Sequence, residues 1–247
     1  MNKTIALLFI ICWSIATNAQ QSIPHGAKAL LKAYPQHVKT YKNNRLYFHD
    51  GTMMVYDDGK SKQFVERMNN ADPDDMFLIP YNRKKKKPTY LHDPGRIRCD
   101  AFFRKIYGST PQEVEKNLVK VSWFGQQLRF TSVCGAADSL RAVARELEHR
   151  PHLHKYLQQS STYYWRKVRG ADRLSPHSYG MTIDVCVEYS NFWQWSNKGK
   201  DETDEISYVN RIPQELVDIF ERHGFIWGGR WYHYDTMHFE FRPELFY

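Results

Sequence analysis

Two groups of histidine and acidic residues in the C-terminal part of the sequence have the composition of a metal site. The first contains His177 and Asp184, which are seven residues apart and have Gly180 between them. Imidazole and carboxylate groups are common protein ligands of a divalent zinc ion. A glycine lets the backbone turn tightly, so that both side chains can point into one space. Taken alone, the pair is more typical of a surface histidine and an aspartate in a turn.

The second group lies near the end of the chain and changes this interpretation. In the run Asp235-Thr-Met-His238-Phe-Glu240, a strand that starts at His238 directs His238 and Glu240 to one face and Phe239 to the core. His238 is then a third ligand, and three protein ligands with one open position for water are typical of a catalytic zinc site. Asp235 has the wrong parity for that strand face and must reach the site from a turn, where it would act as general base. Glu240 would orient a ligand imidazole.

The two groups together carry a family resemblance. The pattern Ser175-x-His-x-x-Gly-x-x-x-Asp184, followed by Asp235-x-x-His238-Phe-Glu, resembles the zinc peptidases of bacterial cell walls. These are D-Ala-D-Ala carboxypeptidases and dipeptidases and L-alanyl-D-glutamate endopeptidases. The resemblance covers residues 128–247, and the Gly-Gly-x-Trp lead-in is most similar to the endopeptidase branch.

The resemblance implies one zinc ion per chain, with His177, Asp184 and His238 as its ligands and Asp235 as the base. Two departures from the family pattern affect the substrate site. Thr182 stands where the family often has alanine, and the segment 131–137 lacks the arginine that usually acts on the transition state.

Other residues are candidates for contact with the substrate. We expect Arg166 to replace the missing arginine, since a guanidinium suits an oxyanion or a carboxylate; a plain surface cation is the alternative. Arg173 is the second candidate for this role. Ser175, which could hydrogen-bond the substrate or orient the turn, is a further candidate substrate contact, and so is Trp231.

The first residues predict export. Residues 1–19 have a charged start at Lys3, a short apolar run and a small-x-small end, as in a secretory signal peptide. Cys12 lies in the apolar run without the residues of a lipoprotein cleavage box before it. We therefore expect an exported protein, periplasmic or extracellular, with no stable membrane insertion after signal cleavage.

The charge of the chain limits the kinds of partner that it can bind, and its cysteine content limits the possible disulfides. The formal net charge is +8, and residues 83–87 are five consecutive cations. Such a charge favours anionic partners, but export and the lack of a nucleic-acid-binding motif argue against DNA or RNA. Peptidoglycan or its peptides are the expected partner, and a monomer is the default. Cys99, Cys134 and Cys186 remain after signal cleavage and allow one disulfide and one free thiol.

The predicted fold class is α+β: a small antiparallel sheet carrying a single zinc site, flanked by helices, with an N-terminal extension. We assign residues 20–120 to the extension, which contains a β-hairpin region, and 121–247 to the peptidase core. Apolar periodicity and capping residues predict helices over 100–107, 113–118, 137–149 and 212–223. Alternation predicts strands over 119–124, 127–133 and 181–187 and from residue 238, and 188–208 is an insertion.

The resulting functional hypothesis is a secreted zinc metallopeptidase that hydrolyses peptidoglycan stem peptides. L-alanyl-D-glutamate endopeptidase cleavage is the first choice, D-alanyl-D-alanine carboxypeptidase cleavage the second, and dipeptidase cleavage the third. Two other classes stay open. A catalytically inactive zinc-containing cell-wall-binding module would keep the metal without hydrolysis, and a structural protein would bind no metal.

Overall fold

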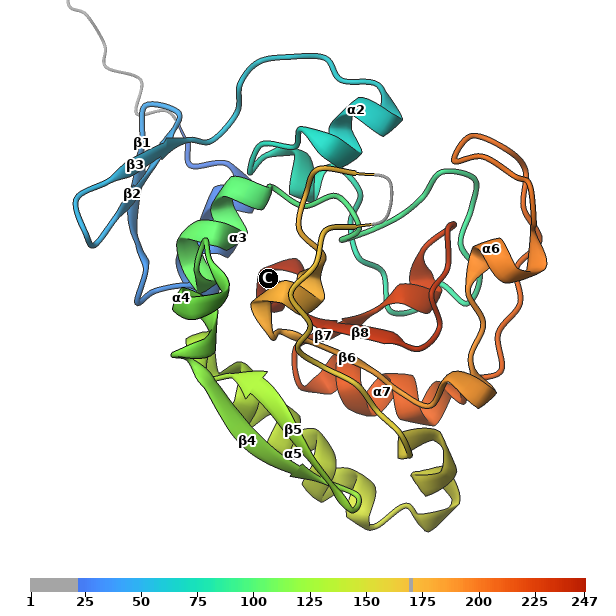
Figure 1. The fold of residues 1–247 in the computed structure, drawn as a ribbon. Helices are drawn as coiled ribbons and strands as arrows, with labels where there is room; N and C mark the ends of the chain where they lie inside the picture. Colours follow the sequence, from blue (N-terminus) through green and yellow to red (C-terminus); the bar gives the residue numbers. More distant parts are fainter. Residues whose placement is uncertain (1–21, 169–170) are drawn as a thin grey trace, which may run out of the picture.

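The computed structural model describes residues 22–168 and 171–247, which form a mixed α and β structure (Figure 1). The helices are α1 (His25–Ala33), α2 (Phe64–Asn69), α3 (Asp100–Tyr107), α4 (Pro111–Glu115), α5 (Ala136–Glu148), α6 (Trp193–Ser196) and α7 (Gln214–Arg222). The strands are β1 (Val38–Lys42), β2 (Arg45–Phe48), β3 (Met53–Val55), β4 (Leu118–Trp123), β5 (Gln126–Thr131), β6 (Thr182–Asp184), β7 (Phe225–Trp227) and β8 (His238–Phe241). The predicted α+β class is thereby confirmed.

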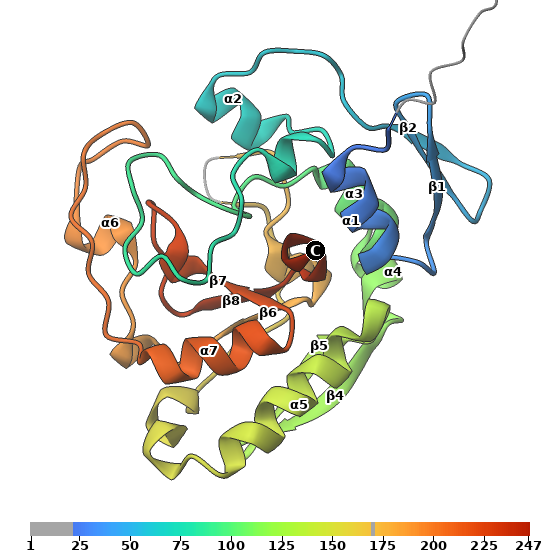
Figure 2. The same cartoon turned by 180° about the vertical axis from the view of Figure 1, so that it is seen from behind.

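Three small antiparallel sheets organise the chain. β1, β2 and β3 form one sheet, β4 and β5 a hairpin, and β6, β8 and β7 a third sheet with β8 in the middle. In both views the β1–β3 sheet and α6 lie on opposite sides of the third sheet (Figures 1 and 2). The register of β6 and β8 pairs Asp184 with His238 and Thr182 with Glu240. Residues more than fifty positions apart are therefore fixed side by side by backbone hydrogen bonds.

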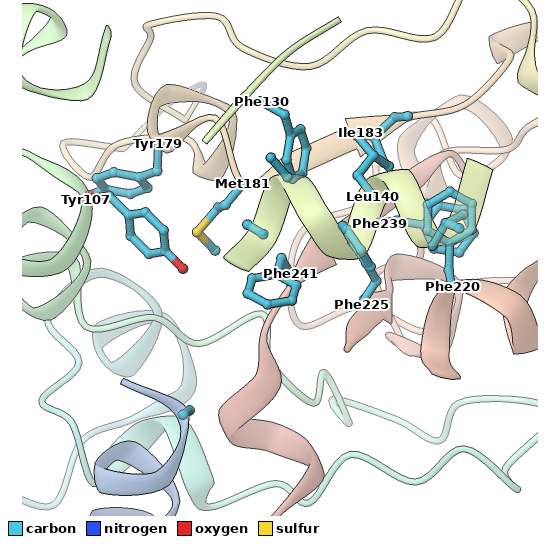
Figure 3. Packing of buried hydrophobic residues seen from close by; sticks show 14 of the residues in the cluster. Tyr107, Phe130, Leu140, Tyr179, Met181, Ile183, Phe220, Phe225, Phe239 and Phe241 are labelled. Atoms are coloured by element: carbon cyan, nitrogen blue, oxygen red, sulfur yellow. The ribbon is translucent and has the colours of Figure 1, made fainter. Parts of the chain in front are cut away.

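The core lies between the third sheet, α5 and α7. Phe220 of α7 stacks on Phe239 of β8 with ring centroids 4.0 Å apart, and it meets Phe225 of β7 edge to face at 5.5 Å (Figure 3). Leu140 of α5 lies in the same cluster. Burying such aromatic side chains is a large stabilising contribution, and here it fixes the side of β8 that faces away from His238.

Most predicted elements form close to their expected bounds, but two expectations were wrong. The strand expected over 181–187 is limited to Thr182–Asp184, because the chain leaves the sheet and enters a short turn of 3-10 helix at Val187–Tyr189. The helix expected over 113–118 is Pro111–Glu115, and Thr110 caps it by accepting a hydrogen bond from the Glu113 backbone N–H. β1 and β7 had not been predicted.

Several other predictions concern the cysteines, the signal peptide, membrane spans and the domain boundary. Cys99, Cys134 and Cys186 are all free thiols, so the disulfide that their number allows is not formed. The signal peptide expected at 1–19 lies outside the described residues. No helix in the described ranges combines the length and apolar character needed to cross a bilayer. The expected boundary after residue 120 falls inside β4, and the division into extension and core stays a prediction.

A core substitution tests the role of the aromatic cluster in stability. Phe220→Ala should lower the free energy of unfolding by about 3–5 kcal/mol, because it removes a fully buried ring and leaves a cavity. Urea unfolding followed by circular dichroism measures this change. Tyr164→Ala is the matched control, since Tyr164 is 67% exposed and should change stability by less than about 0.5 kcal/mol. Equal losses in both variants would contradict this account of the core.

Candidate metal centre

His177, Asp184 and His238 meet in the structure as a group that could hold one metal ion. His177 Nε2 lies 3.1 Å from Asp184 Oδ2, and His238 Nδ1 lies 3.0 Å from Asp184 Oδ1. Both histidines are buried, and their ring centroids are 5.2 Å apart. The carboxylate of Asp184 is thus enclosed by two imidazoles that come from different parts of the chain.

Gly180 lets the backbone turn between His177 and β6. Pro176–Tyr179 is a short 3-10 turn, and Gly180 ends it with φ +65°, a conformation that side chains with a Cβ rarely adopt. A Cβ at this position would also approach Leu118 to 2.4 Å. The turn therefore requires glycine, as the sequence predicted, and it brings His177 back over the strand that carries Asp184.

The hydrogen bonds of the two imidazoles indicate their tautomers. Nδ1 of His177 lies 2.6 Å from the backbone oxygen of Thr162; because a carbonyl only accepts, Nδ1 carries the proton and Nε2 presents a lone pair to Asp184. Both ring nitrogens of His238 face carboxylates, with Nε2 3.3 Å from Glu240 and Nδ1 3.0 Å from Asp184; with a metal ion bound at Asp184, Nε2 would carry the proton and Nδ1 would present its lone pair. A nitrogen lone pair and a carboxylate oxygen at this distance repel each other unless a proton or a metal ion lies between them.

Glu240 is a buried carboxylate that stays ionised. Burial opposes its charge, but Arg98, the hydrogen bond with His238, and Arg242 lower the pKa of Glu240 to about 2. Arg98 Nη1 donates to Oε2 at 3.1 Å and Arg242 Nη1 to Oε1 at 3.0 Å. A carboxylate that accepts from the outer nitrogen of a ligand histidine fixes the ring and makes the inner nitrogen more basic. This arrangement matches the orienting role proposed for Glu240 from the sequence.

Asp235 reaches the same space from a turn. The Asp235 backbone N–H donates to the backbone oxygen of Gly228. A Cβ at position 228 would come within 2.4 Å of the Asp235 backbone oxygen, so the close approach of the two segments requires glycine there. Oδ1 of Asp235 is buried without a hydrogen-bond partner among the described residues. Burial and the nearby charge of Asp184 raise the pKa of Asp235 to about 7. A carboxylate with such a pKa can exchange protons near neutral pH.

The donor set fits zinc. A tetrahedral zinc ion with bonds of about 2.0–2.1 Å requires its ligand atoms to be about 3.3 Å apart, close to the 3.0 and 3.1 Å that separate Asp184 from the two histidines. Two neutral imidazoles and one carboxylate leave a fourth position, as in catalytic zinc sites. The unpartnered Oδ1 of Asp235 belongs to the same pocket and is consistent with a further polar group there.

The other predicted site residues line one pocket of about 570 Å³ with the candidate ligands. Ser175 is buried in the 3-10 turn region, and Trp231 packs its ring 5.5 Å from that of His238. Arg166 is exposed at this pocket, and Arg173 is half-buried in it. Substrate contacts by these four residues stay a prediction.

The pocket also contains His233, together with Arg96 and Glu202, which the sequence analysis did not single out. Asp93 accepts a 2.6 Å hydrogen bond from Nδ1 of His233 and one from the His233 backbone N–H, and both side chains are fully buried. Arg96 binds Asp93 and makes two bonds of 2.7 Å to Glu202 of the 188–208 insertion. The Asp-Pro-Gly-Arg-Ile-Arg run is a recognisable turn signal, but nothing in it shows that the turn faces His233.

Comparison with known protein families agrees with the site. Residues 169–241 match the model of a family described as D-alanyl-D-alanine carboxypeptidase, which is part of a zinc peptidase group. The matched segment holds His177, Asp184, Asp235 and His238, so the expected resemblance to cell-wall zinc peptidases is confirmed over these residues. No curated protein and no solved structure matched the chain.

Removal of one candidate ligand tests the metal centre. His238→Ala should reduce bound zinc from one ion per chain to well below stoichiometry, because it removes one of three converging donors. Elemental analysis after gel filtration measures the zinc content. His152→Ala is the control, since the His152 side chain is 61% exposed and should leave zinc unchanged. Stoichiometric zinc in His238→Ala would show that the ligand set is wrong.

Proposed function

We propose that the protein is a zinc peptidase that hydrolyses peptidoglycan stem peptides. The observation that carries this proposal is the convergence of His177, Asp184 and His238 with Asp235 in one pocket, inside the segment that matches a peptidase family. The predicted signal at residues 1–19 would deliver the chain to the compartment that contains this polymer.

The residues have distinct roles in the proposed hydrolysis. His177, Asp184 and His238 would hold the ion, and zinc bound there would polarise the scissile carbonyl and make water more acidic. Asp235 lines the pocket and, with its raised pKa, accepts a proton from the attacking water and then donates it to the leaving amine. Glu240 holds the imidazole of His238 in position through Nε2.

Two cleavage positions have separate support. The description of the matching family favours removal of the terminal residue from a D-alanyl-D-alanine end, and we place this reaction first. The Gly-Gly-x-Trp lead-in and the Asp-x-x-His-Phe-Glu ending favour cleavage between L-alanine and D-glutamate, which was the first expectation from the sequence. Both reactions break an amide bond next to a D-residue and require the same metal and base.

Substitution of the proposed base separates catalysis from metal binding. Asp235→Asn should keep one zinc per chain but lower the rate of stem-peptide hydrolysis by about 10²–10⁴-fold, because an amide cannot accept the proton. Mass spectrometry of purified stem peptides measures the rate and also identifies the bond: loss of one D-alanine marks the carboxypeptidase, and a new Ala/Glu cut marks the endopeptidase.

The control for this experiment is Asp138→Asn, because the Asp138 side chain is 81% exposed on α5, outside the pocket. It should retain the rate of the unmodified protein. Full activity in Asp235→Asn would remove Asp235 from the mechanism. Stoichiometric zinc in the unmodified chain, without cleavage of any stem peptide, would instead favour a binding module that has lost catalysis.

A further inference from the structure

The pocket around the candidate metal centre is rich in arginine. Arg96, Arg98, Arg166 and Arg173 all line it. Arg96 and Arg98 precede the segment that matches the peptidase family, so that match does not account for them. A concentration of guanidinium groups beside a catalytic centre attracts an anion. Which of these charges is already neutralised by the protein decides where the anion would bind.

Two of the four arginines have carboxylate partners. Arg96 is neutralised by Glu202 at 2.7 Å and by Asp93 at 3.0 Å. Arg98 donates to Glu240 at 3.1 Å, and Glu240 also accepts from Arg242. Arg242 also binds Glu244, so Arg98 and Arg242 share two carboxylates and both have ion-pair partners.

Arg173 lacks such compensation. Within the described residues its side chain has no carboxylate at ion-pair distance; its Nε donates to Asn69 Oδ1 at 3.4 Å, and its Nη1 is buried without any hydrogen-bond partner. Burial, together with the charges of Arg98 and Arg96, lowers the pKa of Arg173 to about 9. A guanidinium nitrogen that is buried without a partner is costly in free energy. An anionic ligand that pairs with Arg173 would offset that cost.

We propose that Arg173, flanked by Arg98, forms a subsite for the free carboxylate of the substrate residue that hydrolysis releases. A guanidinium binds a carboxylate through two parallel hydrogen bonds, and Arg173 lines the pocket with no carboxylate partner among the described residues. A released D-alanine has a free terminal carboxylate, and a glutamate has a second carboxylate outside the scissile bond. The subsite rests on the proposed function and defines its substrates as peptides with an acidic leaving residue.

The proposed subsite gives different roles to Arg166 and Arg173, the two candidate arginines that precede His177 in the sequence. Arg166 is exposed, so water screens its charge and weakens its interaction with a substrate. Arg173 is more enclosed and lies close enough to Arg98 and Arg96 for their charges to act on it. Recognition of the carboxylate by Arg173 leaves Arg166 available for the oxyanion role that the sequence suggested.

The test measures binding rather than hydrolysis. Zinc-loaded full-length protein is titrated calorimetrically with N-acetyl-D-alanine and with N-acetyl-D-alaninamide, which differ only in the charged carboxylate. The unmodified protein should bind the acid about tenfold or more tightly than the amide, as expected for charge-assisted hydrogen bonds. Arg173→Gln should abolish this preference, and Arg173→Lys should retain part of it because it keeps the charge.

Two controls make the outcome specific. Arg145→Gln, an exposed position on α5 outside the pocket, should keep the full preference. Zinc content and the urea midpoint of Arg173→Gln should be unchanged, which excludes loss of the metal or of the fold. Equal binding of acid and amide by the unmodified protein would overturn the subsite, as would a full preference in Arg173→Gln. Failure of the proposed function appears separately, as absence of zinc or of stem-peptide cleavage.

Discussion

The buried carboxylate of Glu240 is the constraint on which the site depends. A charge removed from water is tolerated only when it is paired and hydrogen-bonded. Glu240 meets this requirement with Arg98, Arg242 and His238. The contact with His238 holds the imidazole ring so that its inner nitrogen faces Asp184. One buried anion thus links the stability of the fold to the geometry of the candidate metal centre.

This network extends beyond the segment that matches the peptidase family. Arg242 also binds Glu244, which accepts a 2.7 Å hydrogen bond from Tyr34 at the end of α1. Arg98 reaches Glu240 from the turn before α3. Residues near both ends of the described chain therefore support the centre. The N-terminal part of the chain is a structural component of the site, because without Arg98 the charge of Glu240 would lose one of its two guanidinium partners.

Local patterns in the sequence predicted those parts of the site that local chemistry determines. The turn at Gly180, the reach of Asp235 from a turn and the shared face of His238 and Glu240 follow from backbone geometry and strand parity. The partners supplied by distant segments could not be predicted. The Thr162 carbonyl that orients His177 has no side-chain signature, since every residue carries a backbone oxygen. The pairing of Asp93 with His233 depends on how two loops pack.

Two carboxylates in one pocket have opposite electrostatic environments, and this difference distinguishes their roles. Asp184 lies between two imidazoles which, despite its burial, lower the pKa of Asp184 well below its usual range, so it remains an anion suited to hold a cation. Asp235 is half-buried beside that anion, and burial together with Asp184 raises the pKa of Asp235. Pairs of titratable groups whose pKa values are shifted in opposite directions are typical of acid–base sites. The difference supports the proposed roles of Asp184 in metal binding and of Asp235 in proton transfer.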